Sequence, residues 1–172
     1  SRQHRLMPPG AATTPLLVAN EFSVRLSSRT LLESLNFSLP AGTLIGVLGP
    51  NGSGKTTLLR AIAGTQHYEG QLILAGAEVR AWIPRELARE LAFVRQTPSL
   101  SFEFSVTELV LLGRAPHKHW LDTYNRNDYD LVQTVLAEVG LLGFEDRSVL
   151  TLSGGELQRA FLAQALAQEA NL

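Results

Sequence analysis

The stretch of sequence that decides the fold runs from Thr43 to Ala63 and reads TLIGVLGPNGSGKTTLLRAIA. Its first six residues, Thr43–Leu48, are almost wholly apolar, which is typical of a strand buried on both faces of a parallel sheet. Apolar residues then recur at helical spacing over Lys55–Ala63, and the following Gly64 is suited to end that helix. Between the two, Gly49–Thr56 matches the pattern G-x-x-x-x-G-K-[ST] at every fixed position. We therefore predict a strand, a phosphate-binding loop and a helix in succession.

Each part of this loop has a physical role at a phosphate group. Glycines let the backbone wrap closely and point successive N–H groups toward an anion, and the helix adds its positive dipole end. Lys55 supplies a charge for the β- and γ-phosphates, and the Thr56 hydroxyl can ligate Mg²⁺. The alternative is a glycine-rich turn with an incidental lysine, but a chance match in this length is on the order of one in a hundred. The residues predicted to contact a nucleotide are Gly49, Pro50, Asn51, Gly52, Ser53, Gly54, Lys55, Thr56 and Thr57.

Hydrophobic patterns divide the rest of the chain into an α/β part, residues 15–97, and a helical part, residues 98–172. Period-two and short apolar runs predict further strands at Leu16–Val24, Leu31–Leu39, Gln71–Leu74 and Leu91–Val94. Helical spacing and capping signals predict helices at Pro84–Arg89, Val106–Leu112, Asn127–Val139 and Gly154–Ala170. We expect residues 1–14 to be a flexible tail. For Ser1–Leu6 two readings stay open: a remnant of expression ahead of Met7 as the natural start, or native sequence.

Composition narrows the classes of function. The chain of 172 residues carries 15 basic and 16 acidic side chains, a net charge of −1, which argues against nucleic-acid binding through bulk charge. It has no cysteine, which excludes a disulfide scaffold, a zinc–thiolate site and a cysteine nucleophile. No apolar run approaches the ~18 residues of a membrane span, so we expect no direct membrane insertion. Charged residues make up 18%, below the roughly 25% of a typical soluble domain, which suits a surface with partner interfaces.

A second glycine motif, Leu152–Glu156, opens the last predicted helix with the sequence Leu-Ser-Gly-Gly-Glu. One interpretation is purely structural, with Ser153 as the N-cap and Glu156 as its capping-box partner. The other is functional, because the same helix start offers bare N–H groups and a hydroxyl to a phosphate. Both can hold at once.

These motifs together resemble those of the ATP-binding cassette (ABC) transporter ATPases. Gly49–Thr56 resembles their phosphate loop, Leu152–Glu156 their signature motif, and Gln96 after a predicted strand their Q-loop glutamine. The resemblance implies a P-loop NTPase core, mostly parallel sheet with flanking helices and an N-terminal antiparallel part, with an inserted helical subdomain. The run Gly113-Arg114-Ala115-Pro116-His117 is similar to ATPases of importers for iron chelates, haem or vitamin B12. We do not interpret His117 and His119 as a metal site, since no third ligand is evident.

The resemblance also implies a mechanism. Two copies would form a head-to-tail homodimer, with ATP between the phosphate loop of one and Ser153, Gly154, Gly155 and Glu156 of the other. Thr56 and Gln96 would contact Mg²⁺, and Gln96 also the attacking water. ATP hydrolysis would drive an integral-membrane permease that imports the solute, with the ATPase peripheral on the cytoplasmic face of the membrane. Alternatives are a nucleotide-binding fragment without turnover, and a non-transport ATPase of the same class.

Two departures from the family pattern stand out. Leu26 occupies the position where an aromatic side chain usually stacks on adenine, and Phe22 is the nearest aromatic residue, so GTP could be tolerated. The family's Mg²⁺-binding aspartate, catalytic glutamate and switch histidine follow the signature helix, and the four histidines here all precede it. We therefore expect the chain to be a fragment, truncated after the signature helix, of a longer ATP hydrolase, and to lack turnover alone.

Overall fold

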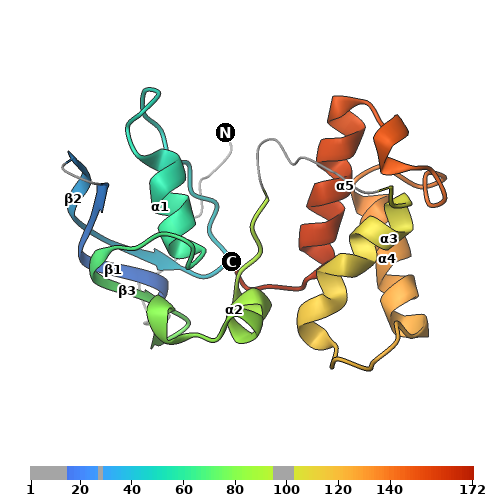
Figure 1. The fold of residues 1–172 in the computed structure, drawn as a ribbon, viewed down its shortest axis with the longest axis horizontal. Coiled ribbons are helices and arrows are strands. Elements are labelled where there is room, and N and C mark those ends of the chain that lie inside the picture. The colour runs from blue at the N-terminus through green and yellow to red at the C-terminus, as the bar shows by residue number, and fades with distance from the viewer. Residues whose placement is uncertain (1–14, 27–28, 95–102) are drawn as a thin grey trace, which may run out of the picture.

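The computed structural model describes residues 15–26, 29–94 and 103–172, which form two lobes (Figure 1). The predicted tail at residues 1–14 and the predicted Q-loop residue Gln96 lie outside the described residues. The sheet lobe contains β1 (Pro15–Leu26), β2 (Arg29–Pro40), α1 (Lys55–Ile62), β3 (Glu69–Leu74), β4 (Ala77–Glu78), the 3₁₀ turn η1 (Val79–Ala81) and α2 (Pro84–Glu90). The helical lobe contains α3 (Val106–Leu111), the 3₁₀ turn η2 (Leu112–His117), α4 (Arg126–Glu138), the 3₁₀ turn η3 (Val149–Thr151) and α5 (Gly154–Ala167).

The sheet of the first lobe has the strand order β2-β1-β3-β4, and every pairing in it is antiparallel. The long central strand β1 pairs with β2 on one edge and β3 on the other, with Leu17 opposite both Leu39 and Leu74. Its pairing is irregular between Ala19 and Phe22. Before this irregularity the buried side chains stand at odd positions, Leu17 and Ala19, and after it they stand at even positions, Phe22 and Val24. The strands predicted at 16–24, 31–39 and 71–74 are thus confirmed.

The irregularity in β1 depends on a glycine in β3. Gly70 has φ +82°, and a Cβ there would lie 2.3 Å from the carbonyl oxygen of Glu21. Glu21 itself has φ 48°, and its N–H donates to Asn36 Oδ1 at 2.8 Å. The two strands therefore approach so closely at this bulge that only glycine fits.

The helices of the second lobe begin where capping signals predict. Ser105 and Glu108 form a capping box at α3, and Asn125 and Asp128 form one at α4. Each box satisfies two helix-start N–H groups, so the chain can turn sharply into each helix. The helices pack on a shared cluster of buried side chains that includes Val106, Leu109, Val110, Val132, Val135, Leu136, Leu141, Val149, Ala160 and Ala163.

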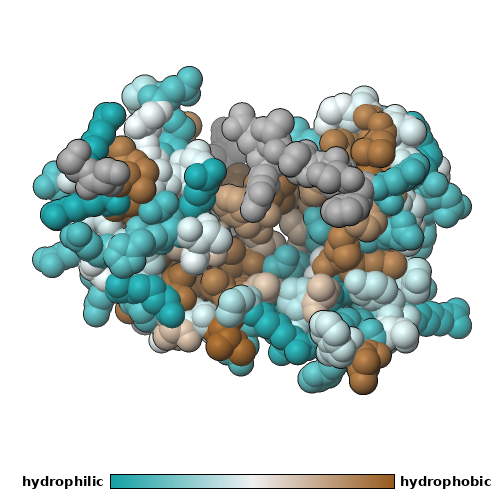
Figure 2. Space-filling model, viewed as in Figure 1, coloured by the Kyte–Doolittle hydropathy of each residue, from teal (hydrophilic) through white to brown (hydrophobic). Residues whose placement is uncertain are grey.

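The strand predicted at Thr43–Leu48 is wrong for this structure: these residues form no strand, and Leu44 and Leu48 are completely exposed. A strand buried on both faces needs a strand on each edge, and neither β1, β2, β3 nor β4 pairs with this run. Ile45 and Val47 instead line an apolar groove of about 610 Å³ with side chains of β1, β2, α1 and residues 91–93. Brown, apolar side chains gather in this central region in Figure 2.

The prediction of a buried strand at Leu91–Val94 is also wrong in part. Leu91 is buried, but Phe93 and Val94 are about 40% exposed, and no strand is assigned there. The N–H of Leu172 donates to Glu90 O at 2.9 Å and the N–H of Ala92 to Leu172 O at 2.8 Å. This alternating pattern is that of one parallel bridge, so the parallel pairing predicted for the sheet is limited to a single residue pair in the part of the chain described.

Candidate functional site

The loop Gly49–Gly54 lies on the surface and leads directly into α1. Gly54 is the N-cap in the left-handed region, with φ +90°, and a Cβ there would lie 2.8 Å from Leu32 Cδ2. Gly52 has φ +80°. Gly52 and Gly54 thus hold backbone angles that other residues adopt only with strain. Leu32 of β2 packs against the loop at Gly54.

Lys55 bends back over the loop that precedes it. Its Nζ donates to the carbonyl oxygens of Gly49 and Pro50, at 2.7 Å each, and lies 3.5 Å from Ser53 Oγ. The ammonium group is therefore held at the mouth of the loop rather than in solvent. This is the position from which a lysine meets the terminal phosphates of a nucleotide.

The start of α1 has the chemistry of an anion site. Gly54 provides no side-chain cap, and the first turn contains no acidic residue. The N–H groups of Lys55, Thr56 and Thr57 precede the first intrahelical donor, Leu58, which bonds Gly54 O at 2.8 Å. These groups and the positive helix end fit phosphate oxygens.

A magnesium ion at this loop would take Thr56 as its protein ligand. The Thr56 side chain is exposed and lines a wide cavity of about 1150 Å³. No cluster of three or more acidic or histidine side chains occurs among the residues described. Mg²⁺ with a nucleotide needs only one or two protein ligands, because phosphate oxygens and water complete its shell, so the residues present fit.

The predicted signature residues form a capping box at the start of α5. Ser153 N–H and Oγ–H both donate to Glu156 Oε2 at 2.8 Å, and Glu156 N–H donates to Ser153 Oγ at 3.4 Å. The backbone hydrogen bond from Ser153, together with the side-chain one, lowers the pKa of Glu156. A Cβ added at Gly154 or Gly155 would meet nothing within 4 Å, and both glycines are exposed. The structural interpretation of Leu152–Glu156 is confirmed, and the phosphate-binding one stays a prediction.

The two candidate phosphate sites belong to different lobes. The start of α1 lies in the sheet lobe and that of α5 in the helical lobe, both toward the same end of the view in Figure 1. The predicted base-stacking position, Leu26, is 44% exposed at the end of β1. Phe22 is completely buried and packs against Tyr68 with ring centroids 5.4 Å apart, so it is not available to a base.

Sequence reasoning missed an ion cluster that binds the helical lobe together. Asp128, only 4% exposed, accepts from Arg114 Nε at 3.2 Å, pairs with Lys118 and caps α4. Burial raises the pKa of this carboxyl, but hydrogen bonds from Lys118, the Asn125 backbone and Arg114 outweigh burial and hold it below its ordinary value. The N-cap pattern at Asn125 predicts the cap, but no local signal predicts the two distant cations.

His117 and His119 take separate structural roles. His117 Nε2 lies 2.8 Å from Gln168 O at the end of α5, and the His119 N–H donates to Asp122 at 2.7 Å. Both contacts fix turns.

An α/β lobe with a glycine loop, a lysine and an uncapped helix start defines a P-loop nucleotide-binding domain. Comparison with known proteins agrees. The model of the ABC transporter family matches residues 32–172, and the chain belongs to that family.

Individual relatives are similar over most of this chain. It is 35% identical to the petrobactin import ATP-binding protein of Bacillus anthracis, over 91% of the chain and 58% of that protein. It is 40% identical to the hemin import ATP-binding protein of Deinococcus radiodurans, over 91% of the chain and 59% of that protein. A solved nucleotide-free ATP-binding cassette from an ABC transporter superposes with a TM-score of 0.77 at 24% identity, over 91% of this chain and 66% of that one, and confirms the fold class. The chain thus spans less than two thirds of the length of these two curated relatives.

Among the residues that the structure describes, no helix combines the length and the apolar character that crossing a bilayer requires.

Proposed function

We propose that this chain is the nucleotide-binding part of an ABC importer ATPase, which in its complete form couples ATP hydrolysis to uptake of an iron–siderophore, haem or cobalamin. The observation that carries the proposal is the loop Gly49–Thr56 at the uncapped start of α1, with Lys55 Nζ held over its carbonyl oxygens. Relatives named for petrobactin and hemin import support the class of solute.

The chain's own residues would divide the work at the nucleotide. The loop N–H groups and Lys55 would bind the β- and γ-phosphates, and Thr56 would hold an Mg²⁺ ion, which would supply positive charge at those phosphates. Gln96 is proposed as the contact to Mg²⁺ and the attacking water. With Leu26 in place of a ring, the base loses a stacking contribution of about 1 kcal/mol, so GTP could be tolerated beside ATP.

The signature residues would act on a nucleotide held by another copy of the chain. Ser153 and Gly155 lie in the lobe opposite the phosphate loop, and the surface at the two glycines is open. A head-to-tail homodimer would bring them to the γ-phosphate of the partner's nucleotide. Closure then depends on that phosphate, and hydrolysis would reopen the dimer and move an integral-membrane permease on the cytoplasmic side.

Nucleotide-dependent thermal stabilisation tests the phosphate loop. Mg-ATP should raise the melting temperature of the chain, and Lys55→Ala should abolish the shift. Arg60→Ala is the matched control, because it removes a cation from the same helix without touching the loop, and it should keep the shift. If Lys55→Ala is stabilised as much as the unaltered chain, the assignment of the loop is wrong.

Dimerisation tests the signature. In the complete protein, Ser153→Arg should leave ATP binding nearly intact but prevent ATP-dependent dimerisation, measured by light scattering. Thr134→Arg, on the exposed face of α4, is the control for an added charge in the same lobe. Normal dimerisation of the Ser153 variant would leave the capping box as the only role of this motif.

A further inference from the structure

The two lobes are joined by polar contacts rather than by a common apolar core. The buried apolar side chains form two clusters, one confined to each lobe. Between the lobes, the described residues make hydrogen bonds that run mainly from long side chains to backbone oxygens. Such an interface permits rotation unless particular bonds fix the angle.

One set of these bonds lies where the chain itself crosses between the lobes. Gln168 Nε2, just after α5, donates to the carbonyl oxygens of Ala88 and, at 2.7 Å, Leu91. Leu172 then forms its parallel bridge between Glu90 and Ala92. Among the described residues this crossing is one line of attachment, since the chain's other passage between the lobes lies at residues 95–102, and on its own it would serve as a pivot.

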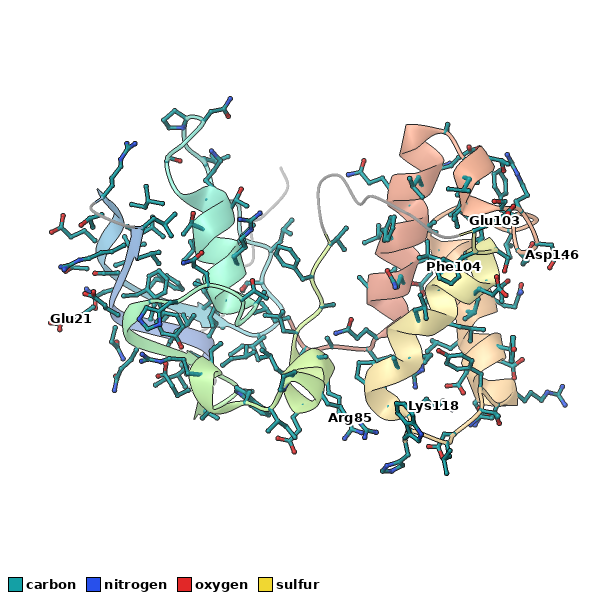
Figure 3. The ribbon with its side chains drawn as sticks, viewed as in Figure 1. Glu21, Arg85, Glu103, Phe104, Lys118 and Asp146 are labelled. Atoms are coloured by element: carbon teal, nitrogen blue, oxygen red, sulfur yellow. The ribbon has the colours of Figure 1, made fainter. Side chains whose placement is uncertain are left out.

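A second attachment starts from two arginines on α2. Arg85 Nε donates to Pro116 O at 3.1 Å, and its second guanidinium nitrogen donates to Lys118 O. Arg89 Nε donates to the same Pro116 oxygen at 2.8 Å. Figure 3 shows Arg85 extending from α2 toward the side of the helical lobe where Lys118 lies. Pro116 lies in η2 and Lys118 follows it, so both acceptors are far in the sequence from the crossing at residues 168–172.

The turn η2 is itself fixed to α5. A Cβ at Gly113 would lie 2.2 Å from Gln164 O, so the two backbones are in direct contact. Arg114 donates to Ala167 O at 2.7 Å, and His117 Nε2 contacts Gln168 O at 2.8 Å. Because of these contacts, a rotation of η2 carries α5 with it.

We propose that Arg85 and Arg89 are positioning residues that latch the helical lobe at a fixed angle to the phosphate-loop lobe. The crossing supplies the pivot, and the two guanidinium groups supply the second point that prevents rotation about it. Since α5 has 14 residues, it is about 20 Å long, and a rotation of about 10° at its end moves Ser153 by about 3.5 Å. The latch thus sets where the start of α5 lies relative to the phosphate loop.

The absence of cysteine from the sequence makes a direct test simple. Cysteines introduced at Glu33 on β2 and Gln133 on α4, both exposed positions, accept spin labels without background labelling. Pulsed electron paramagnetic resonance then gives the distribution of distances between the lobes. We expect a narrow distribution for the chain with native latch residues and a distribution at least twice as wide for Arg85→Ala/Arg89→Ala.

The control is Arg126→Ala, which removes an exposed arginine of α4 that bonds only within its own lobe, 3.9 Å from Asp130. It should leave the width unchanged. Far-UV circular dichroism shows whether each variant is folded, and if the double variant is not, Arg89→Ala alone removes one bond and should still broaden the distribution. Equal widths in folded latch variants and control would overturn the proposal, and this result is independent of any nucleotide measurement.

Discussion

In the helical lobe Val106, Val110 and Leu136 are completely buried, whereas in the sheet lobe Leu44 and Leu48 are completely exposed. A helix makes its backbone hydrogen bonds within itself and needs only one apolar face covered, but a central strand needs a neighbour on each edge. The helical lobe therefore completes its core with its own residues. The run at 43–48 has the apolar sequence of a core strand, but none of the described strands pairs with it.

The starts of α5 and α1 differ in a related way. At the start of α5 the Glu156 carboxylate accepts from the Ser153 N–H and Ser153 Oγ accepts from the Glu156 N–H, while α1 has no side-chain cap and no acidic residue in its first turn. Local capping favours the helix itself, and its omission leaves the donors for an anion from elsewhere. The start of α1 thus leaves its N–H groups without a side-chain partner, whereas the start of α5 has a complete capping box of its own.

The largest expected effect is a difference in stability between the same leucine-to-alanine substitution made in each lobe. Leu136→Ala should lower the free energy of unfolding by about 4 kcal/mol, because it opens a cavity in a closed core. Leu44→Ala, the same substitution at an exposed site, should change it by less than about 0.5 kcal/mol. Urea unfolding followed by circular dichroism measures both, and comparable losses would contradict the difference between the lobes.

Asp128→Asn should cost about 3 kcal/mol, because it leaves Arg114 and Lys118 without their buried counter-charge. Since folding lowers the pKa of Asp128, its contribution is complete above the ordinary value of 3.8 and is lost as pH falls through the lower folded value. The free energy of unfolding measured between pH 6 and pH 2 should show this loss in the native sequence and not in Asp128→Asn. Asp130→Asn, on the exposed face of α4, should retain the acid dependence.

Gly113→Ala should cost about 2 kcal/mol, because the added methyl group would overlap the backbone of α5 at Gln164. Gly154→Ala is the matched control, since a Cβ there meets nothing within 4 Å. Thermal unfolding of the two variants compares Gly113, where close packing requires glycine, with Gly154, where packing leaves room for a methyl group. Similar melting temperatures would show that η2 can move away from α5.

The smallest effect concerns the capping box of α5. Ser153→Ala should cost about 1 kcal/mol and Ser153→Thr much less, because threonine keeps the hydroxyl. The lowered pKa of Glu156 means that its stabilising contribution falls as the solution is acidified through the folded pKa, and Ser153→Ala should weaken that dependence. Chemical unfolding at two pH values measures both effects. An unchanged stability would mean that the box adds nothing to α5.

Sequence predicted the helices well because their signals are local. Pro84–Arg89 is observed as Pro84–Glu90 and Asn127–Val139 as Arg126–Glu138, since caps and apolar spacing lie within each helix. The strand expected at Thr43–Leu48 depends on partners elsewhere in the chain, which no local pattern reveals. The ion pairs of Asp128 could not be predicted for the same reason, because Arg114 and Lys118 lie in other segments of the chain.

The confinement of buried apolar side chains to two separate clusters has a consequence for the order of folding. Both lobes depend on distant pairings: α3 packs against α5 across α4, and β1 pairs with β3, with Leu17 meeting Leu74 only after the phosphate loop and α1 have been passed. Local contacts form fast and distant pairings slowly, because loop closure costs entropy before the pairing is gained. The pairing of β1 with β2, which are adjacent in the chain, can therefore form before either lobe completes its core.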